Sequence, residues 1–84
     1  MDDLRRVFGA RIRALRRARE FSQEELAGRA GIHWTYLSDL ERGEQSPSLD
    51  VVNRLARGLR VTLADLFQPL DISYRAHARK RRRP

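Results

Sequence analysis

Apolar residues recur at helical spacing along most of this 84-residue chain. Near the N-terminus they are separated by four, four and three residues, with arginines between them: Leu4, Phe8, Ile12 and Leu15. Residues at these intervals share one face of an amphipathic helix. The two aspartates at the start suit the positive end of the helix dipole. The pattern therefore predicts a first helix that ends near Glu20.

Two shorter helical segments follow, each with its own start and stop signals. Ser22 and Glu25 have capping-box spacing, in which the hydroxyl accepts from the glutamate amide and the carboxylate returns a bond. The helix that begins there should end at Gly31, a residue that adopts left-handed backbone angles easily. A third helix is predicted over residues 34–42, ending at Gly43. Two short helices joined by a tight, glycine-containing turn form a helix-turn-helix unit.

Residues 43–48 read as a loop, and two further helices follow it. Ser48 is a candidate N-cap for a helix whose apolar face is Leu49, Val52, Leu55, Ala56 and Leu59. Thr62 and Asp65 repeat the capping-box spacing before a last short helix, and Pro69 ends regular structure. There is no strand pattern and no internal repeat. The chain is therefore predicted to be all-α, with five helices.

The basic charge is concentrated at the C-terminus. The net charge is +7, from 18 basic and 11 acidic residues, and residues 75–84 hold six of the basic residues and no acid. The remaining 12 basic and 11 acidic residues leave residues 1–74 at only +1. We therefore expect a globular domain over residues 1–74 and a basic, flexible tail over residues 75–84. Such a tail either contacts nucleic-acid phosphates or only solvates the chain end.

Size and composition argue against several functional classes. A domain this small buries too little surface to enclose a deep substrate pocket. The chain has no cysteine, and its two histidines, His33 and His77, have no carboxylate at metal-ligand or triad spacing. No apolar stretch reaches the roughly 20 residues of a membrane span. We therefore expect a protein without enzymatic activity, metal or cofactor. We also expect it to be cytoplasmic and associated with the nucleoid.

The order and spacing of several short motifs resemble the phage-repressor and Cro-type (XRE) helix-turn-helix family. The resemblance covers about residues 4–68 and rests on five segments: Ser22–Ala27, Ala30–Gly31, Leu37–Ser38, Leu40–Gly43 and Pro47–Leu49. It implies a lambda-repressor-like domain that binds DNA. Within the family, residues 35–43 are especially similar to restriction–modification controller proteins.

The outer face of the third helix carries side chains suited to reading bases. At 100° per residue, Leu37, Leu40 and Glu41 share one side of this helix, and the polar residues Thr35, Ser38, Asp39 and Arg42 project from the opposite side. Thr35 suits a thymine methyl, Asp39 a cytosine amino group, and Arg42 a guanine or a phosphate. The alternative is an ordinary solvated helix face. The second position of a helix-turn-helix favours DNA readout.

The remaining candidate DNA contacts flank this face. The resemblance implies that Gln23, in the first turn of the second helix, contacts the DNA backbone, where free amides also bind anions. Trp34 and Tyr36 are candidates for stacking beside an easily deformed base step, although Trp34 stands where relatives more often carry arginine and could instead pack at the core edge. In the loop, Gln45 and Ser46 are expected to contact the backbone beside an unfavourable Glu44.

Two further features concern structure. The resemblance implies that Arg16 and Glu41 form an ion pair that links the first helix to the end of the third, and Arg16 is also a candidate phosphate contact. The alternative is two independent surface charges, which contribute little when exposed. The family usually has glycine at the position of Arg60, whereas this chain has Gly58 two residues earlier. Either Arg60 is left-handed, which is uncommon without glycine, or the fourth helix ends differently.

The C-terminal part of the domain has more apolar residues than one small domain can bury. We expect a symmetric homodimer whose interface includes Leu63, Leu66, Phe67, Leu70 and Ile72; some of these would otherwise close the monomer core. The preferred function is a sequence-specific regulator of transcription that binds double-stranded DNA at a palindromic operator, with RNA polymerase as a further candidate partner. The alternative is an antitoxin or adaptor module whose DNA binding is secondary.

Overall fold

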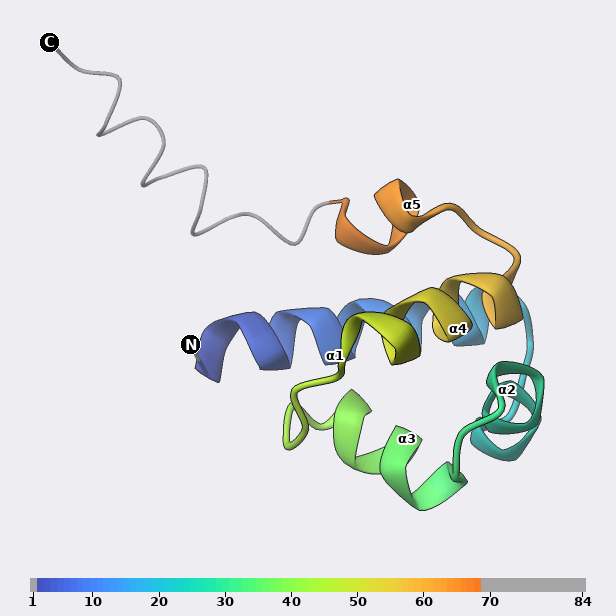
Figure 1. The fold of residues 1–84 in the computed structure, drawn as a ribbon, viewed down its shortest axis with the longest axis horizontal. Coiled ribbons are helices and arrows are strands. Elements are labelled where there is room, and N and C mark those ends of the chain that lie inside the picture. The colour runs from blue at the N-terminus through green and yellow to red at the C-terminus, as the bar shows by residue number, and fades with distance from the viewer. Residues whose placement is uncertain (1, 69–84) are drawn as a thin grey trace, which may run out of the picture.

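Five helices and short connections account for residues 2–68, the part of the chain that this computed structural model describes. The helices, in chain order, are α1 (Asp2–Ala18), α2 (Gln23–Ala30), α3 (Trp34–Glu41), α4 (Leu49–Leu59) and α5 (Leu63–Phe67). The all-α fold predicted from periodicity is confirmed, and residues 2–68 contain no strand (Figure 1). None of these helices combines the length and apolar character that a membrane crossing requires.

Helix α1 ends two residues before the predicted position. Arg19 and Glu20 form a turn, and Glu20 has φ 61°, in the left-handed region. The amide of Phe21 then donates to the carbonyl of Arg16 at 3.1 Å, which directs the chain toward α2. The difference is within the ordinary uncertainty of helix ends.

The capping signals at the starts of α2 and α5 have different outcomes. Ser22 Oγ accepts from the amide of Glu25 at 3.0 Å, as predicted, but the carboxylate of Glu25 accepts from Arg29 at 3.2 Å instead of completing the box. An arginine one turn further along the same face competes for that carboxylate. At α5 both bonds of the box are present, each at 3.0 Å between Thr62 and Asp65.

The end of α4 resolves the alternatives that the sequence left open. Helix α4 ends at Leu59, and Arg60 takes left-handed angles, φ 62° and ψ 45°. Gly58 lies inside the helix, where an added Cβ would be 3.2 Å from the Ala30 amide and 3.3 Å from Leu26 Cδ1. The glycine therefore serves the close approach of α2 and α4, and Arg60 provides the left-handed cap at a cost of roughly 1–2 kcal/mol.

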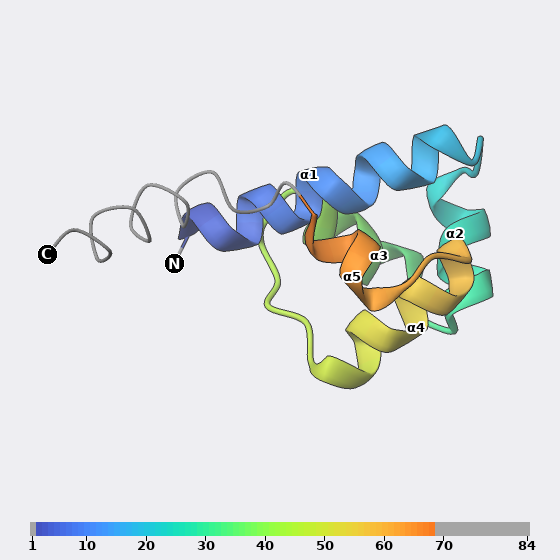
Figure 2. The same ribbon diagram turned by 90° about the horizontal axis from the view of Figure 1, so that it is seen from above.

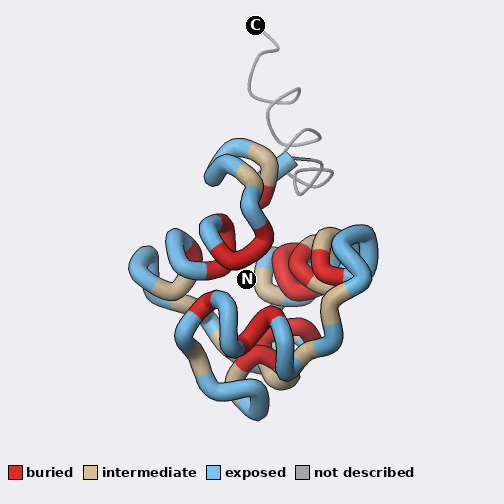
Figure 3. Tube along the Cα trace, turned by 90° about the vertical axis from the view of Figure 1, so that its right-hand side faces the viewer, coloured by how far each residue is buried: buried red, intermediate tan, exposed pale blue. Residues whose placement is uncertain are grey.

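The core lies between α1, α2 and α4, and α3 and α5 close its two sides. In Figures 1 and 2, α3 and α5 lie on opposite sides of the layer formed by α1 and α4. Figure 3 shows the buried parts of the helices turned toward the centre. The buried apolar residues are Phe8, Ile12, Leu26, Ala27, Ala30, Leu37, Leu40, Val52, Leu55, Ala56, Leu59 and Leu66. Each large one contributes roughly 1.5–3 kcal/mol to folding, and together they hold α3 against the domain.

Candidate nucleic-acid interface

Helix α3 has one face in the core and one face in solvent. Leu37, Leu40 and Glu41 are buried, as predicted. On the other face Thr35 and Arg42 are exposed, and Ser38 and Asp39 are partly exposed. The four polar residues proposed to read bases therefore lie on one accessible surface.

The two aromatic residues of α3 have different environments. Trp34 retains 47% of its exposure, so about half of this residue is available to a ligand. Tyr36 is half-buried and packs against the hydrophobic core. A stacking role thus fits Trp34 directly, whereas the ring of Tyr36 is partly used by the fold.

His33 fixes the start of α3. Its backbone is extended, and its Nδ1 accepts from the amide of Thr35 at 3.1 Å. An N-cap residue of this kind satisfies one of the amides that a helix start leaves without a partner. The position of His33 directly before the third predicted helix is the signal in the sequence for this capping role.

Arg42 joins the polar residues of α3 into one cluster. The guanidinium of Arg42 donates to Ser38 Oγ at 2.7 Å, to Asp39 Oδ1, and to Glu44 Oε1 at 3.3 Å. Arg42 is exposed, and exposed ion pairs contribute little to stability, so these bonds exchange easily. The cluster can therefore release an arginine for guanine or phosphate and a carboxylate for cytosine.

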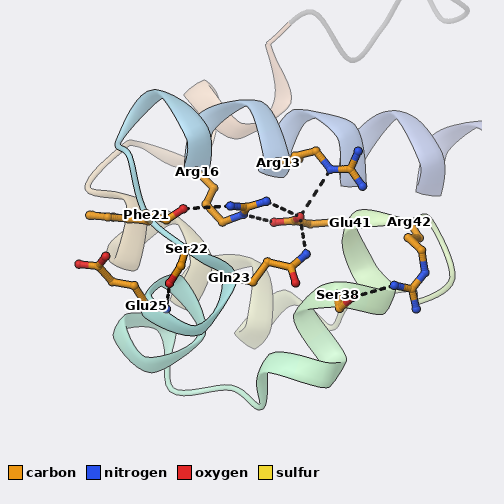
Figure 4. A network of polar contacts seen from close by, with 9 residues as sticks. All are labelled: Arg13, Arg16, Phe21, Ser22, Gln23, Glu25, Ser38, Glu41 and Arg42. Atoms are coloured by element: carbon orange, nitrogen blue, oxygen red, sulfur yellow. Dashed lines mark hydrogen bonds and ion pairs between the residues drawn. The ribbon is translucent and has the colours of Figure 1, made fainter.

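Glu41 is the centre of a buried polar network behind this surface (Figure 4). Arg16 donates to both of its carboxylate oxygens, at 2.7 and 3.0 Å, and Gln23 Nε2 donates to Oε1 at 2.9 Å. Arg13 adds an ion pair at 3.6 Å. The ion pair implied by the resemblance is thus present, together with two further partners of Glu41, Gln23 and Arg13, that no sequence pattern connects to it. The network joins α1, the start of α2 and the end of α3.

The protonation of Glu41 follows from these contacts. Burial raises the pKa of this carboxyl, but the hydrogen bonds from Arg16 and Gln23 and the charges of Arg16 and Arg13 outweigh burial, so the pKa lies below its ordinary value. Arg16 also donates to the carbonyl of Phe21 at 2.9 Å. Because its three nitrogens are all engaged, Arg16 is a structural residue and not an available phosphate ligand.

Gln23 is held in the first turn of α2, where contact with a DNA backbone was expected. Its side-chain amide is half-buried and bonded to Glu41, so its orientation is set by the network. The first amides of a helix lack carbonyl partners within that helix and attract anions. In the loop after α3, Gln45 is half-buried and Ser46 is exposed.

The candidate dimer residues do not share one environment. Leu63 and Phe67 keep 48% and 47% of their exposure, and they lie four residues apart on α5, a spacing that places them on one face. Leu66 is fully buried in the monomer, so its assignment to the dimer interface is wrong: its position on α5 faces α1 and α4. Leu70, Ile72 and the basic tail lie outside the described residues.

Comparisons with known proteins agree with this geometry. Residues 7–68 match the family model of a helix-turn-helix domain. The chain is 38% identical over 69 residues to an uncharacterized HTH-type transcriptional regulator of Sinorhizobium fredii, covering 82% of this chain and 90% of that protein. It is also 38% identical over 67 residues to the control protein C.BamHI of Bacillus amyloliquefaciens, covering 79% and 83% of the two chains.

A solved structure shows the same architecture. The restriction-modification controller protein C.AhdI of Aeromonas hydrophila superimposes with a TM-score of 0.75 at 39% identity. The match covers 80% of this chain and all of that one. The helices α2 and α3, which carry the candidate site, lie within residues 7–68, the part matched by the family model.

Proposed function

Since the chain belongs to the helix-turn-helix domain family, whose matched members include transcriptional regulators, we propose that it regulates transcription as a homodimer that binds a palindromic operator. The observation that carries this proposal is the outer face of α3. Four polar side chains are exposed or partly exposed there, while the buried Glu41 network fixes the helix from behind. A fixed helix with a free polar face suits the major groove.

The roles of individual residues follow from their positions. Thr35, Ser38, Asp39 and Arg42 would contact base edges, with Trp34 and Tyr36 beside them. Gln23, Gln45 and Ser46 would contact phosphates and set the register of the domain on the duplex. The apolar face of Leu63 and Phe67 would pair two copies. Binding to successive major grooves would require the two α3 helices of such a dimer to lie about 34 Å apart, one turn of DNA.

The comparisons do not favour one kind of operon as the target. The identity to the Sinorhizobium fredii regulator equals the identity to C.BamHI, 38% in both cases. Control of a restriction–modification operon is therefore one proposed role within the wider regulator class. The protein would act at the nucleoid, with RNA polymerase as a proposed second partner.

Selection of bound sequences from a random duplex pool tests this function. The full-length chain should enrich a palindrome, and Thr35→Ala should change the enriched bases, because Thr35 is exposed on the reading face. Asn53→Ala, on the exposed side of α4, is the matched control and should leave the motif unchanged. A chain that lacks residues 75–84 should keep the motif with lower affinity.

Two outcomes of the selection would contradict the proposed regulation of transcription. Without an enriched motif, or with binding that only the tail deletion abolishes, the affinity would be nonspecific attraction to phosphates. The protein-interaction module would then be preferred.

A further inference from the structure

A basic surface lies on the domain, on residues that do not belong to the polar face of α3. It is a groove of about 250 Å³ between the C-terminal half of α2 and the helix α4. Its lining residues are Gly28, Arg29, Ala30, Gly31, Arg54 and Arg57. Three of these six are arginines and none is acidic, although residues 1–74 as a whole carry almost no net charge.

The arginines of the groove are positioned in different ways. Arg54 donates to the carbonyl of Gly31 at 3.1 Å, which anchors it beside the turn between α2 and α3. Arg29 pairs with Glu25 and lies 4.3 Å from the centre of the Phe21 ring. Arg57 is exposed, and within residues 2–68 its guanidinium has no acidic partner. The groove therefore has positive charge that the described fold leaves uncompensated.

Gly28 is a second observation at the same place. It lies inside α2, where glycine costs roughly 1 kcal/mol relative to alanine. It has no left-handed φ, and a Cβ added there would meet nothing within 4 Å. Gly58 is explained by the close approach of α2 and α4, but neither packing nor backbone angles within the domain explain Gly28. A missing side chain on the groove wall lets an outside molecule approach the α2 backbone.

The groove has a defined position relative to the reading helix. Gly31 belongs to the groove and also ends α2, and α3 begins three residues later at Trp34. Figure 1 shows the end of α4 beside α2, and the bond from Arg54 to Gly31 ties α4 to the turn that leads into α3. The groove therefore lies beside the turn that precedes the N-terminal end of α3.

We propose that the α2/α4 groove binds phosphates of the DNA that flanks the half-site, at the N-terminal end of α3, with Arg57 and Arg54 as the ligands. Arginine presents several donors in a planar array that suits phosphate oxygens. The open wall at Gly28 admits the sugar-phosphate strand. This contact rests on the proposed function and extends it: the operator includes flanking DNA that carries no base code but whose backbone adds affinity.

The salt dependence of binding by the full-length protein tests the contact. Two duplexes are compared, one cut at the end of the selected half-sites and one extended by about ten base pairs, one turn, on each side. On the extended duplex, Arg57→Gln should lower the slope of log K against log salt concentration by about 0.9, the value for one phosphate. Arg17→Gln, which removes an exposed arginine of α1, is the matched control.

Gly28→Gln is the second variant, since its Cβ would meet nothing within 4 Å and its uncharged side chain would occupy part of the groove. It should weaken binding to the extended duplex and leave binding to the short one unchanged. An unchanged slope for Arg57→Gln on the extended duplex, or equal losses on both duplexes, would overturn the proposal. If Thr35→Ala leaves the selected motif unchanged, the proposed function is overturned and this contact with it. If the motif depends on Thr35 but the salt slope of Arg57→Gln is unchanged, only the contact is overturned, and the groove would instead suit an acidic protein partner.

Discussion

At the scale of single residues, the candidate interface depends on how carboxylates are shared among basic groups. Glu41 is buried and accepts from Arg16 and Gln23, so it has one stable set of partners. Asp39 is on the surface and shares Arg42 with Ser38 and Glu44. The first arrangement holds helices in place because desolvated charges need their partners. The second leaves polar groups that DNA can recruit at small cost.

Glu41→Gln should reduce both stability and its dependence on pH. The pKa of Glu41 is below its ordinary value of 4.5 in the folded protein, so its stabilisation is complete above that value and is lost as pH falls through the folded pKa. At pH 7 the variant leaves Arg16 without its carboxylate, and we expect the free energy of unfolding to fall by about 3 kcal/mol. Urea unfolding at pH 7 and below pH 4.5 measures both effects.

The pH profile has a control within the chain. Glu24→Gln removes an exposed carboxylate from the first turn of α2 and should change stability by only about 0.3–1 kcal/mol. The pKa of Asp65 is also lowered, by hydrogen bonds from Thr62, so some acid sensitivity should persist in Glu41→Gln. A variant profile that parallels the wild type at every pH would contradict the role assigned to Glu41.

At the scale of elements, close approaches between helices position α3. Helix α1 crosses α3 at Gly9, where an added Cβ would overlap the carbonyl oxygen of Leu40 and lie 2.8 Å from that of Glu41. Both oxygens belong to backbone, so no side-chain rotation can relieve the clash. The α1–α3 contact thus requires glycine at this position, and the same contact brings Arg16 to Glu41.

Gly9→Ala and Gly28→Ala should have opposite effects on stability. The first forces α3 away from α1, and we expect a loss of about 2–3 kcal/mol, as for overpacking in a core. The second places a methyl group in open space on α2 and should gain about 0.5–1 kcal/mol from helix propensity. Urea midpoints of the two variants provide the measurement. Equal stability of Gly9→Ala and the wild type would mean that the two helices do not depend on this contact.

At the scale of the whole molecule, the described domain presents three distinct surfaces. Helix α3, which bears the polar face, and helix α5, which bears Leu63 and Phe67, lie on opposite sides of the α1/α4 layer (Figure 1). The basic groove lies at the junction of α2 and α4. Two copies joined through α5 would thus keep both α3 faces free, which is what simultaneous binding to two half-sites requires.

Leu63→Glu should separate the dimer without unfolding the domain. Leu63 is about half exposed, so a charge there meets solvent in the monomer but would be buried between two copies. We expect a monomer by analytical ultracentrifugation and roughly tenfold or weaker operator binding, a change of about 1.4 kcal/mol or more. Leu66→Ala is the contrasting core variant and should cost about 3 kcal/mol of folding stability. A Leu63→Glu protein that is dimeric with wild-type affinity would place the interface elsewhere.

The sequence by itself determined the five helices, the turn between α2 and α3, and which side of α3 faces outward. These features depend on local chemistry, because periodicity, N-cap hydroxyls and Gly31 act within a few residues of one another. The polar face of α3 could be predicted from the sequence because it too depends only on the spacing of residues within one helix. Only the competition of Arg29 for Glu25, also local, was missed at the start of α2.

The tertiary structure decided the features that join distant segments. Burial assigned Leu66 to the core while leaving Leu63 exposed, although both residues lie on one short apolar helix. Packing also connected Gln23 to Glu41, required Gly58 at the α2–α4 approach and left the cap of α4 to Arg60. No local pattern encodes these outcomes, because each depends on which surface of another helix arrives at that point.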